Sequence, residues 1–419
     1  MSESVQRRLG TSDAVGRGLA AMLGTGVFAV WTPAAAAAGP WLLLAVVLAA
    51  VVATCNAAST SDLAVAHPES GAGYVYGRER LSPGAGRLAG VAFLVGKTAS
   101  AAAAAGVFGS YVLPAQPTAA AVVVIVGVTA LNISGVRWTA RGAYTLVGGT
   151  LAVLLLVVVS GLLGGGREEA ASAAARTLDT PVAPQGGVLG VFTAAGLIFF
   201  AFAGYARIAT LGEEVRDPSR TLRRAIGLAL GITLVTYLLV AVALLVGLGT
   251  DRLATEAAPL VALVDSGPTS SLGVLVRVGA AVASGSALLS VLVGVSRTGL
   301  AMARRAELPS ALALIGSRGT PWRADVAGGL LAVVVAVLAG PAAAIALSAC
   351  SVLVYYAVVN LAALRMAPPE RRWPMWASWL GLVLCLGLAV LLPLTQVAVT
   401  AVALAAGWAL CTLLGRRAG

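Results

Sequence analysis

The residues best suited to chemistry are Gly24-Thr25-Gly26, at the centre of the first long apolar stretch. Inside lipid every backbone N–H and C=O group needs a partner. Two glycines around a hydroxyl residue at that depth therefore predict a helix break that protein, water or a ligand completes. The second half-helix would present free N–H groups and partial positive charge, which suit a carboxylate. The first half would present free carbonyls, which suit an ammonium group or a cation.

A second break is expected at Phe200-Ala201-Phe202-Ala203-Gly204, in the sixth apolar stretch. Paired interruptions of this kind are the best sequence indicator of a midplane substrate site. Two breaks side by side would hold both ends of a zwitterion, and one of the two phenyl rings would close over its side chain. The alternative is that the glycines only pack helices together and that the phenyl rings face lipid or core.

The elements that position these motifs must be membrane helices. Of the 419 residues, 59% are hydrophobic and only 11% are charged, whereas soluble domains have about 25% charged residues. The net charge of +11 would suit nucleic acid, but the arginines lie in short connections between apolar runs, so we expect no nucleic-acid partner. The four cysteines fall in apolar spans and His67 is the only histidine, so no disulfide, metal or cofactor is expected.

Apolar stretches of about 20 residues predict twelve transmembrane helices in an all-α polytopic protein of the cytoplasmic (inner) membrane. The expected spans are 14–38, 41–66, 84–113, 118–135, 141–163, 188–211, 221–249, 271–303, 324–340, 342–364, 376–394 and 396–415. The chain then divides into a cytoplasmic tail (1–13), a first half (14–163), a second half (188–364) and two appended spans (376–415).

Arginine bias predicts the orientation, because positive residues favour the cytoplasmic side. With a cytoplasmic N-terminus, 21 arginines fall in cytoplasmic segments and 3 on the other side. Both termini are therefore expected in the cytoplasm. Five spans separate the two broken ones, so the broken helices run in opposite directions. This count predicts two inverted halves of five spans each.

At these residues the chain resembles the amino acid–polyamine–organocation (APC) superfamily of amino-acid permeases. Four segments in the family's order carry the resemblance: Ala20-Ala21-Met22-Leu23-Gly24-Thr25-Gly26-Val27-Phe28, Ser61-Asp62-Leu63-Ala64 with His67 to Tyr76, Phe199 to Tyr205 with Gly212 to Pro218, and Ser296-Arg297 with Ala301 to Arg304 and Leu308-Pro309. The four motifs are specific for the superfamily and weak for the substrate.

The resemblance implies a five-plus-five inverted-repeat fold with broken helices 1 and 6, and transport by alternating access. It implies that the first break binds a substrate carboxylate, that the second meets the amino group, and that Phe200 is an aromatic gate. The expected substrate-binding residues are Met22, Gly24, Thr25, Gly26, Phe200, Ala201, Phe202, Ala203 and Gly204.

A lysine that some family members carry in span 5 is replaced here by Thr150. Lys97, the only lysine of the chain, lies in the middle of span 3, where a charge costs about 2.5–3.5 kcal/mol and is a functional candidate. We expect Lys97 to supply the internal cation or titrating amine that Thr150 lacks. The alternative is a lysine that donates to helix carbonyls. Ser284 and Ser286 lie where family members place a sodium-like site, although serines also bond to their own helix.

A cytoplasmic gate is expected around Arg207, one turn after the second break. Its candidate partners are Asp62, Glu213 and Glu214, and Glu214 would hold the inward gate closed. A structural arginine that reaches the interface is the alternative.

A secondary amino-acid transporter, either a symporter or an exchanger, is the favoured function, with proton or sodium coupling left open. An intramembrane enzyme would need acid, base or metal ligands clustered at one interface, and His67, Glu69 and Asp62 fit a loop motif better. A channel would need a ring of charge or a repeated filter motif. No acidic residue is expected to face the site, so a neutral amino acid is the predicted substrate.

Overall fold

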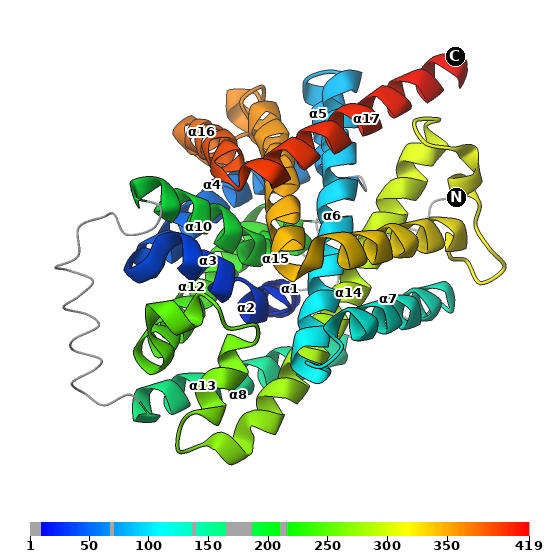
Figure 1. The fold of residues 1–419 in the computed structure, drawn as a ribbon. Coiled ribbons are helices and arrows are strands. Elements are labelled where there is room, and N and C mark those ends of the chain that lie inside the picture. Colours follow the sequence, from blue (N-terminus) through cyan, green and yellow to red (C-terminus); the bar gives the residue numbers. More distant parts are fainter. Residues whose placement is uncertain are drawn as a thin grey trace.

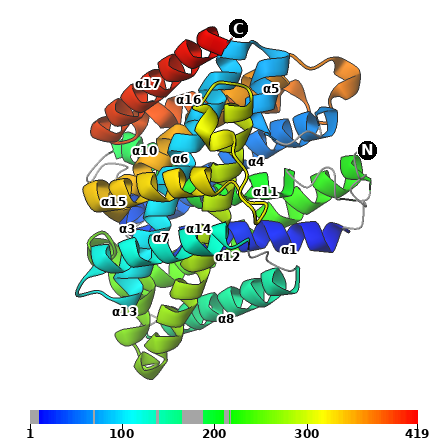
Figure 2. The same ribbon diagram turned by 90° about the vertical axis from the view of Figure 1, so that its right-hand side faces the viewer.

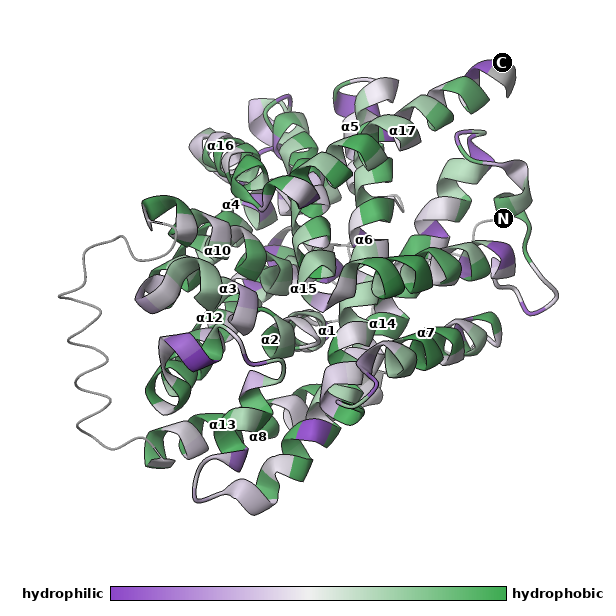
Figure 3. Cartoon of the chain, viewed as in Figure 1, coloured by the Kyte–Doolittle hydropathy of each residue, from purple (hydrophilic) through white to green (hydrophobic). Residues whose placement is uncertain are grey.

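The computed structural model describes residues 10–67, 71–135, 140–164, 187–209, 215 and 217–418, and the described part is helical apart from its turns and connections. Eight of its helices are long and apolar enough to cross a membrane, and two shorter apolar helices, Pro117–Ile133 and Met375–Leu391, accompany them. Polar residues lie mainly at helix ends and in the connections (Figure 3). This confirms the prediction of an all-helical polytopic membrane protein.

The first half of the chain begins with a helix in three pieces. The elements are α1 (Thr11–Met22), α2 (Gly26–Ala29), α3 (Trp31–Ala38), η1 (Gly39–Trp41), α4 (Leu42–Ala66), α5 (Gly73–Arg80), α6 (Pro83–Val112), α7 (Pro117–Ile133) and α8 (Ala140–Gly164). Proline at the first or second position opens α6 and α7, where its missing N–H group costs no hydrogen bond.

The second half of the chain repeats an interrupted helix at its start. The elements are α10 (Gly187–Phe202), η2 (Ala203–Tyr205), α11 (Ala206–Ala209), α12 (Pro218–Leu253), α13 (Pro259–Asp265), η3 (Ser270–Leu272), α14 (Gly273–Arg304), η4 (Ser310–Ala313), α15 (Trp322–Ala363), η5 (Pro368–Glu370), α16 (Met375–Leu391) and α17 (Leu394–Ala418).

The longest helix, α15, contains two of the expected spans. Gly340 has φ 68° and ψ 171° inside it, a conformation that glycine adopts readily because it has no Cβ. Pro341 follows and cannot donate a helical hydrogen bond. Figure 1 shows the result as two arms that meet at a sharp bend. The predicted division between 324–340 and 342–364 therefore falls at this bend.

The helix boundaries lie within a few residues of the expected spans throughout the described part. The largest difference is at α12, which continues from the expected end at residue 249 to Leu253 through a bend at Gly249 (φ 71°). The number of crossings, the inverted halves and the orientation stay predictions.

The interior of the bundle holds the interrupted helices. The first interrupted helix packs mainly against α8 and α12 through α1, and against α10 through α3, while α2 also meets α6 and α15. The long helix α6 runs through the molecule between α14 and α15, as the two perpendicular views show (Figures 1 and 2). Both predicted breaks are therefore buried inside the protein, where lipid does not reach their backbone groups.

Candidate functional site

The two predicted breaks lie in direct contact with each other. A Cβ atom added to Gly26 would lie 2.5 Å from the Cβ of Ala201. One added to Gly204 would lie 2.6 Å from the carbonyl carbon of Ala21 and 2.7 Å from the nitrogen of Met22. Real Cβ atoms do not approach other atoms so closely, so both glycines are required by backbone contact. The structure thus brings Gly24-Thr25-Gly26 and the Ala201–Gly204 segment together.

The interruptions are short. The first helix stops at Met22 and restarts at Gly26, and the second tightens into the 3-10 turn Ala203–Tyr205 before α11. Thr25 itself has helical angles (φ −53°, ψ −37°). Gly24 and Gly26 are not in the left-handed region, so unusual backbone angles do not explain these glycines. Close packing does, with Ala287 of α14 lying 3.2 Å from a Cβ built on Gly24.

Tyr237 of α12 binds carbonyl groups at both breaks. Its hydroxyl donates to the Met22 carbonyl over 2.5 Å and has the Ala201 carbonyl at 3.3 Å. The Met22 side chain is fully buried, with its sulfur 3.7 Å from the hydroxyl of Thr233 on the same helix. A carbonyl freed at a break in a buried helix needs such a donor. Tyr237 was not predicted, because one tyrosine in an apolar span carries no motif.

Thr25 is the polar side chain at the centre of the site. It is 4% exposed, and its hydroxyl has no hydrogen-bond partner among the described residues. A buried hydroxyl without a partner costs about 1–3 kcal/mol. Such groups in a native fold call for a specific explanation, such as a bound water or ligand. The N-terminus of α2 adds free N–H groups directly after Thr25.

The phenylalanines of the second break have different environments. Phe202 is fully buried, and its ring meets that of Tyr237 with centroids 4.9 Å apart. Phe200 is half-buried. Ala201 and Ala203 are buried at 3% and 4% exposure. Phe200 packs against the core from a partly exposed position, whereas Phe202 belongs to the packing behind the break. The role of Phe200 as a gate stays a prediction.

Lys97 lies on α6, and its side chain is half-buried. Its ammonium nitrogen is 5.9 Å from the centroid of the Phe93 ring, and that ring is 5.6 Å from Tyr355 of α15. Arg207 is near enough for its charge to act on Lys97. No described contact joins Lys97 to the breaks themselves.

The candidate cation residues occupy two neighbouring helices. Thr150 is buried on α8, which packs against α14 where Val153 meets Gly279. On α14, Ser284 is fully buried and donates to the Ala280 carbonyl. Ser286 donates to the Ala283 carbonyl over 3.0 Å. Both hydroxyls thus donate their hydrogen bonds to carbonyls of their own helix. Only their oxygen lone pairs remain available to bind a cation.

The gate residues are placed in part. Arg207 lies on α11, whose Ile208 packs against Gly18 of α1. Asp62 accepts the backbone N–H groups of Arg372 and Trp373 over 3.0 and 3.1 Å. Glu213 and Glu214 lie outside the described residues, so the pairing of Arg207 with them stays a prediction.

A second charged network, around Glu307, was not predicted. Glu307 is 1% exposed and accepts from Tyr74, Arg78 and Arg87 over 2.6, 2.6 and 3.2 Å. Burial and the hydrogen bond to Glu307 raise the pKa of Tyr74 to about 12, so its hydroxyl stays a donor. The network ties α5 and α6 to the end of α14. Its signal in the sequence was weak, because Glu307 is one acidic residue beside several arginines.

Ala72 and Ala306 flank that network with unusual backbone. They have φ of 43° and 57°, values that residues with a Cβ rarely adopt. Each lies within two residues of a network member, Tyr74 or Glu307. Strained backbone of this kind costs about 1–3 kcal/mol and persists where surrounding contacts hold it. The Tyr74–Glu307 contact is such a restraint.

A buried polar cluster joins α4, α15 and α16, and it was also missed. Asn360 donates to Asn56 over 2.6 Å, and Ser59 donates to Asn360 over 2.7 Å. The thiol of Cys385 lies 3.2 Å from the side-chain oxygen of Asn56, and Ser378 lies 2.9 Å from Ser59. Asparagines within apolar spans are the sequence signal that identifies such clusters.

Comparison with known proteins identifies the family. The sequence profile of the amino acid permease family matches residues 13–415. An uncharacterized transporter of Mycobacterium tuberculosis is 48% identical over 406 residues, covering 97% of this chain and 90% of that protein. The branched-chain amino acid permease BcaP of Bacillus subtilis is 24% identical, and the match covers 75% of this chain and 70% of that protein. The vacuolar cationic amino acid transporter 2 of Arabidopsis thaliana is 30% identical, and the match covers 87% of this chain and 61% of that protein.

The family match spans nearly all of the described helices, including both breaks and the four motifs that predicted it. The shared features are therefore those of the whole fold and not of one segment. The chain belongs to the amino acid permease family of the APC superfamily, and it is an amino-acid transporter of the membrane.

Proposed function

We propose that this protein is a secondary active transporter that moves a neutral amino acid by alternating access, with the substrate bound between the two helix breaks. The carboxylate takes the N–H groups that open α2 and the hydroxyl of Thr25. Tyr237 already contacts the carbonyls of Met22 and Ala201, so the amino group takes the remaining carbonyls between Phe202 and Gly204. Phe200 closes over the side chain.

The observation that carries this proposal is the contact between the breaks, with the unpartnered Thr25 hydroxyl beside it. Gly26 touches Ala201 and Gly204 touches Ala21 and Met22, so both ends of a small zwitterion are within reach at once. Helix N-termini attract carboxylates through their free N–H groups and dipole. A site made of backbone also recognises what amino acids share, and leaves the side chain to the surrounding residues.

The neutral substrate follows from the side chains against the breaks. Ala287, Thr233 and Tyr237 are among the described side chains that contact the breaks, and none of these three is acidic. A cationic substrate side chain buried without a carboxylate would carry a large desolvation cost. Of the three relatives, the two whose names give a substrate differ, one in branched-chain and one in cationic amino acids, so the choice is left to the site.

Alternating access is proposed to proceed in the twelve-helix, five-plus-five arrangement, with both termini in the cytoplasm. The two interrupted helices then run antiparallel and rock together against the remaining bundle. Coupling is assigned to Lys97 as the interior amine. Ser284 and Ser286, three residues or fewer from Ala287, are the candidates for a sodium-like site.

A counterflow screen tests the transport proposal. The purified chain in liposomes is loaded with each amino acid or amine in turn, with and without proton and sodium gradients. We expect uptake of one group of neutral amino acids, and dependence on one gradient. Uptake that needs an internal amino acid and ignores both gradients would instead identify an exchanger. No uptake or thermal stabilisation by any of these compounds contradicts the proposal.

The site itself is tested by Gly26→Ala. Its Cβ would force Ala201 away and separate the breaks, so we expect substrate affinity to fall by about tenfold or more. Gly148→Ala is the matched control, because a Cβ there meets no atom within 4 Å on the exposed side of α8. Equal affinity in both variants would place the substrate elsewhere.

A further inference from the structure

A narrow groove opens to the membrane between α4 and α12. It has a volume of about 200 Å³, and its lining is apolar apart from one hydroxyl and an indole: Ala50, Thr54, Ala57, Ala58, Ile226, Gly227, Leu230, Gly231, Leu234 and Trp373. From Ala50 to Ala58 the groove follows α4 for about 12 Å. One leaflet of hydrocarbon is about 15 Å deep, so the length suits the upper part of one acyl chain.

Two glycines make the groove hollow. Gly227 and Gly231 lie one turn apart on the exposed side of α12, and a Cβ added to either meets no atom within 4 Å. The space beside them is therefore open and not filled by a neighbouring side chain. The lining is apolar and faces outward, which excludes a polar solute as the occupant.

The end of the groove that carries Trp373 is polar and positively charged. The guanidinium of Arg223 lies 5.4 Å from the Trp373 ring, and Arg372 and Arg224 are exposed nearby in the sequence. Trp373 has a buried indole N–H with no hydrogen-bond partner among the described residues. Among the described residues, the acid found at this end is Asp62, and it accepts backbone N–H groups of Arg372 and Trp373.

We propose that this groove, the Arg223 groove, binds one anionic phospholipid. An acyl chain lies along Gly227 and Gly231, and the lipid phosphate lies at Arg223 and Arg372. The free indole N–H of Trp373 donates to the phosphate or to an ester carbonyl. Tryptophan and arginine at the membrane interface suit this depth, and each arginine near an anionic surface contributes binding.

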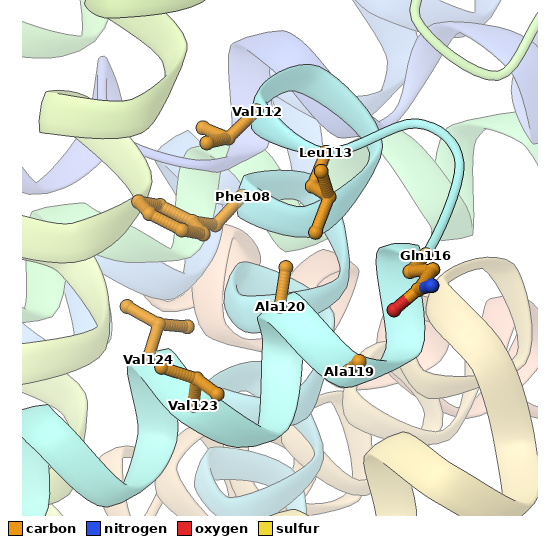
Figure 4. Close-up of a pocket in the computed structure, with 8 residues that line it drawn as sticks. All are labelled: Phe108, Val112, Leu113, Gln116, Ala119, Ala120, Val123 and Val124. Carbon is orange, nitrogen blue, oxygen red and sulfur yellow. The ribbon is translucent and has the colours of Figure 1, made fainter.

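A second groove on the molecule shows why the arginines decide which groove is assigned to an anionic lipid. It lies between α6 and α7, has a larger volume of about 550 Å³, and is lined by apolar side chains and Gln116 (Figure 4). No arginine or lysine lines it. That groove can hold any acyl chain, but it offers no cation for a phosphate. Of these two grooves, the Arg223 groove is the one that combines an apolar channel with a positive mouth.

Native mass spectrometry and thermal shift test the proposal on the full chain. The probes are phosphatidylglycerol, phosphatidylcholine and inorganic phosphate. We expect one tightly bound phosphatidylglycerol and a raised melting temperature, with no comparable effect of the other two probes. Arg223→Ala and Arg372→Ala should each weaken phosphatidylglycerol binding about fivefold. Arg323→Ala is the matched control, because Arg323 also lies over a tryptophan ring (Trp322, 5.2 Å) but away from the groove.

The acyl-chain part is tested separately by filling the groove. Gly231→Leu should abolish the bound phosphatidylglycerol, whereas Gly127→Leu, at another exposed glycine with open space on α7, should retain it. Equal binding of phosphatidylcholine, or unchanged binding in the arginine variants, overturns the headgroup assignment. A shift reproduced by inorganic phosphate, or unchanged binding in Gly231→Leu, overturns the lipid groove.

Discussion

At the scale of single residues, the contact between the two breaks depends on glycines, which have no side chain. Gly26 and Gly204 allow two backbones to touch where any Cβ would separate them. The sequence predicted these glycines for ligand contact, with helix packing as the alternative. The structure places Gly26 and Gly204 in a packing contact between the two breaks. Their contact with a ligand stays a prediction.

Tyr237 is the residue whose hydroxyl supports both breaks. Tyr237→Phe removes its contacts with the Met22 and Ala201 carbonyls and retains the ring contacts with Phe202 and Trp31. We expect a loss of about 1–3 kcal/mol in stability, because buried carbonyls lose their donor, together with slower uptake. Thermal unfolding and uptake assays measure both effects.

Tyr144→Phe is the control for that variant. It also removes one hydroxyl, which donates to Asp13 over 2.8 Å, but Tyr144 is 43% exposed. Uptake by Tyr237→Phe as fast as by Tyr144→Phe would show that the breaks hold their geometry without this hydroxyl.

Lys97 offers a test of coupling. If its amine takes part in the cycle, Lys97→Ala should lower the uptake rate by about tenfold or more and flatten the dependence of uptake on pH. Lys97→Arg keeps a positive charge that does not titrate, so it should retain binding but lose the pH dependence. A Lys97→Ala protein with wild-type rate and pH profile would reduce Lys97 to a structural role.

At the scale of elements, short helices outside the expected spans tie the long ones together. The helix α5 connects to α14 through Glu307 and to the α15–α16 connection through Arg80. Arg80 binds both carboxylate oxygens of Glu370 over 2.9 and 2.7 Å, and donates to His67 over 2.7 Å. The Glu307 contacts join the predicted first and second halves, and the Arg80–Glu370 pair joins the first half to the segment before the two appended spans.

The Arg80–Glu370 link predicts a pH dependence. The hydrogen bonds from Arg80 lower the pKa of Glu370 from 4.5 to about 2. A carboxylate with a lowered pKa in the fold stabilises it fully above its unfolded pKa. That contribution is lost as pH falls from about 4.5 toward 2.

Glu370→Gln should therefore lower the melting temperature by the same amount at pH 7 and pH 5.5, and by less below about pH 4. Melting curves of both proteins across that range measure the difference. Glu256→Gln is the control, since its side chain takes part in no described ion pair. A difference that already disappears between pH 7 and 5.5 would contradict the assignment.

At the scale of the whole molecule, the arginine distribution predicts an orientation that labelling can test. The four natural cysteines are buried, at 0–5% exposure, so they should react little with a membrane-impermeant thiol reagent. Arg252 and Arg318 are both exposed and lie on opposite predicted sides. In intact cells, Arg252→Cys should react and Arg318→Cys should react only after permeabilisation. The reverse pattern would invert the predicted topology.

The sequence by itself determined the membrane class, the helix boundaries, the family and the positions of both breaks. These follow from local properties: apolar length, glycine and proline placement, and short motifs. A helix in lipid satisfies its own backbone, so its extent can be predicted without its neighbours.

Only the tertiary structure decided which groups meet. It placed Gly26 against Ala201, Tyr237 against the carbonyls at both breaks, and Glu307 inside a ring of donors contributed by distant segments. It also distinguished Phe202, fully buried behind the break, from Phe200, which is half-buried. Such contacts depend on how helices pack, and a membrane helix can turn any of its faces inward while the hydropathy of the sequence stays the same.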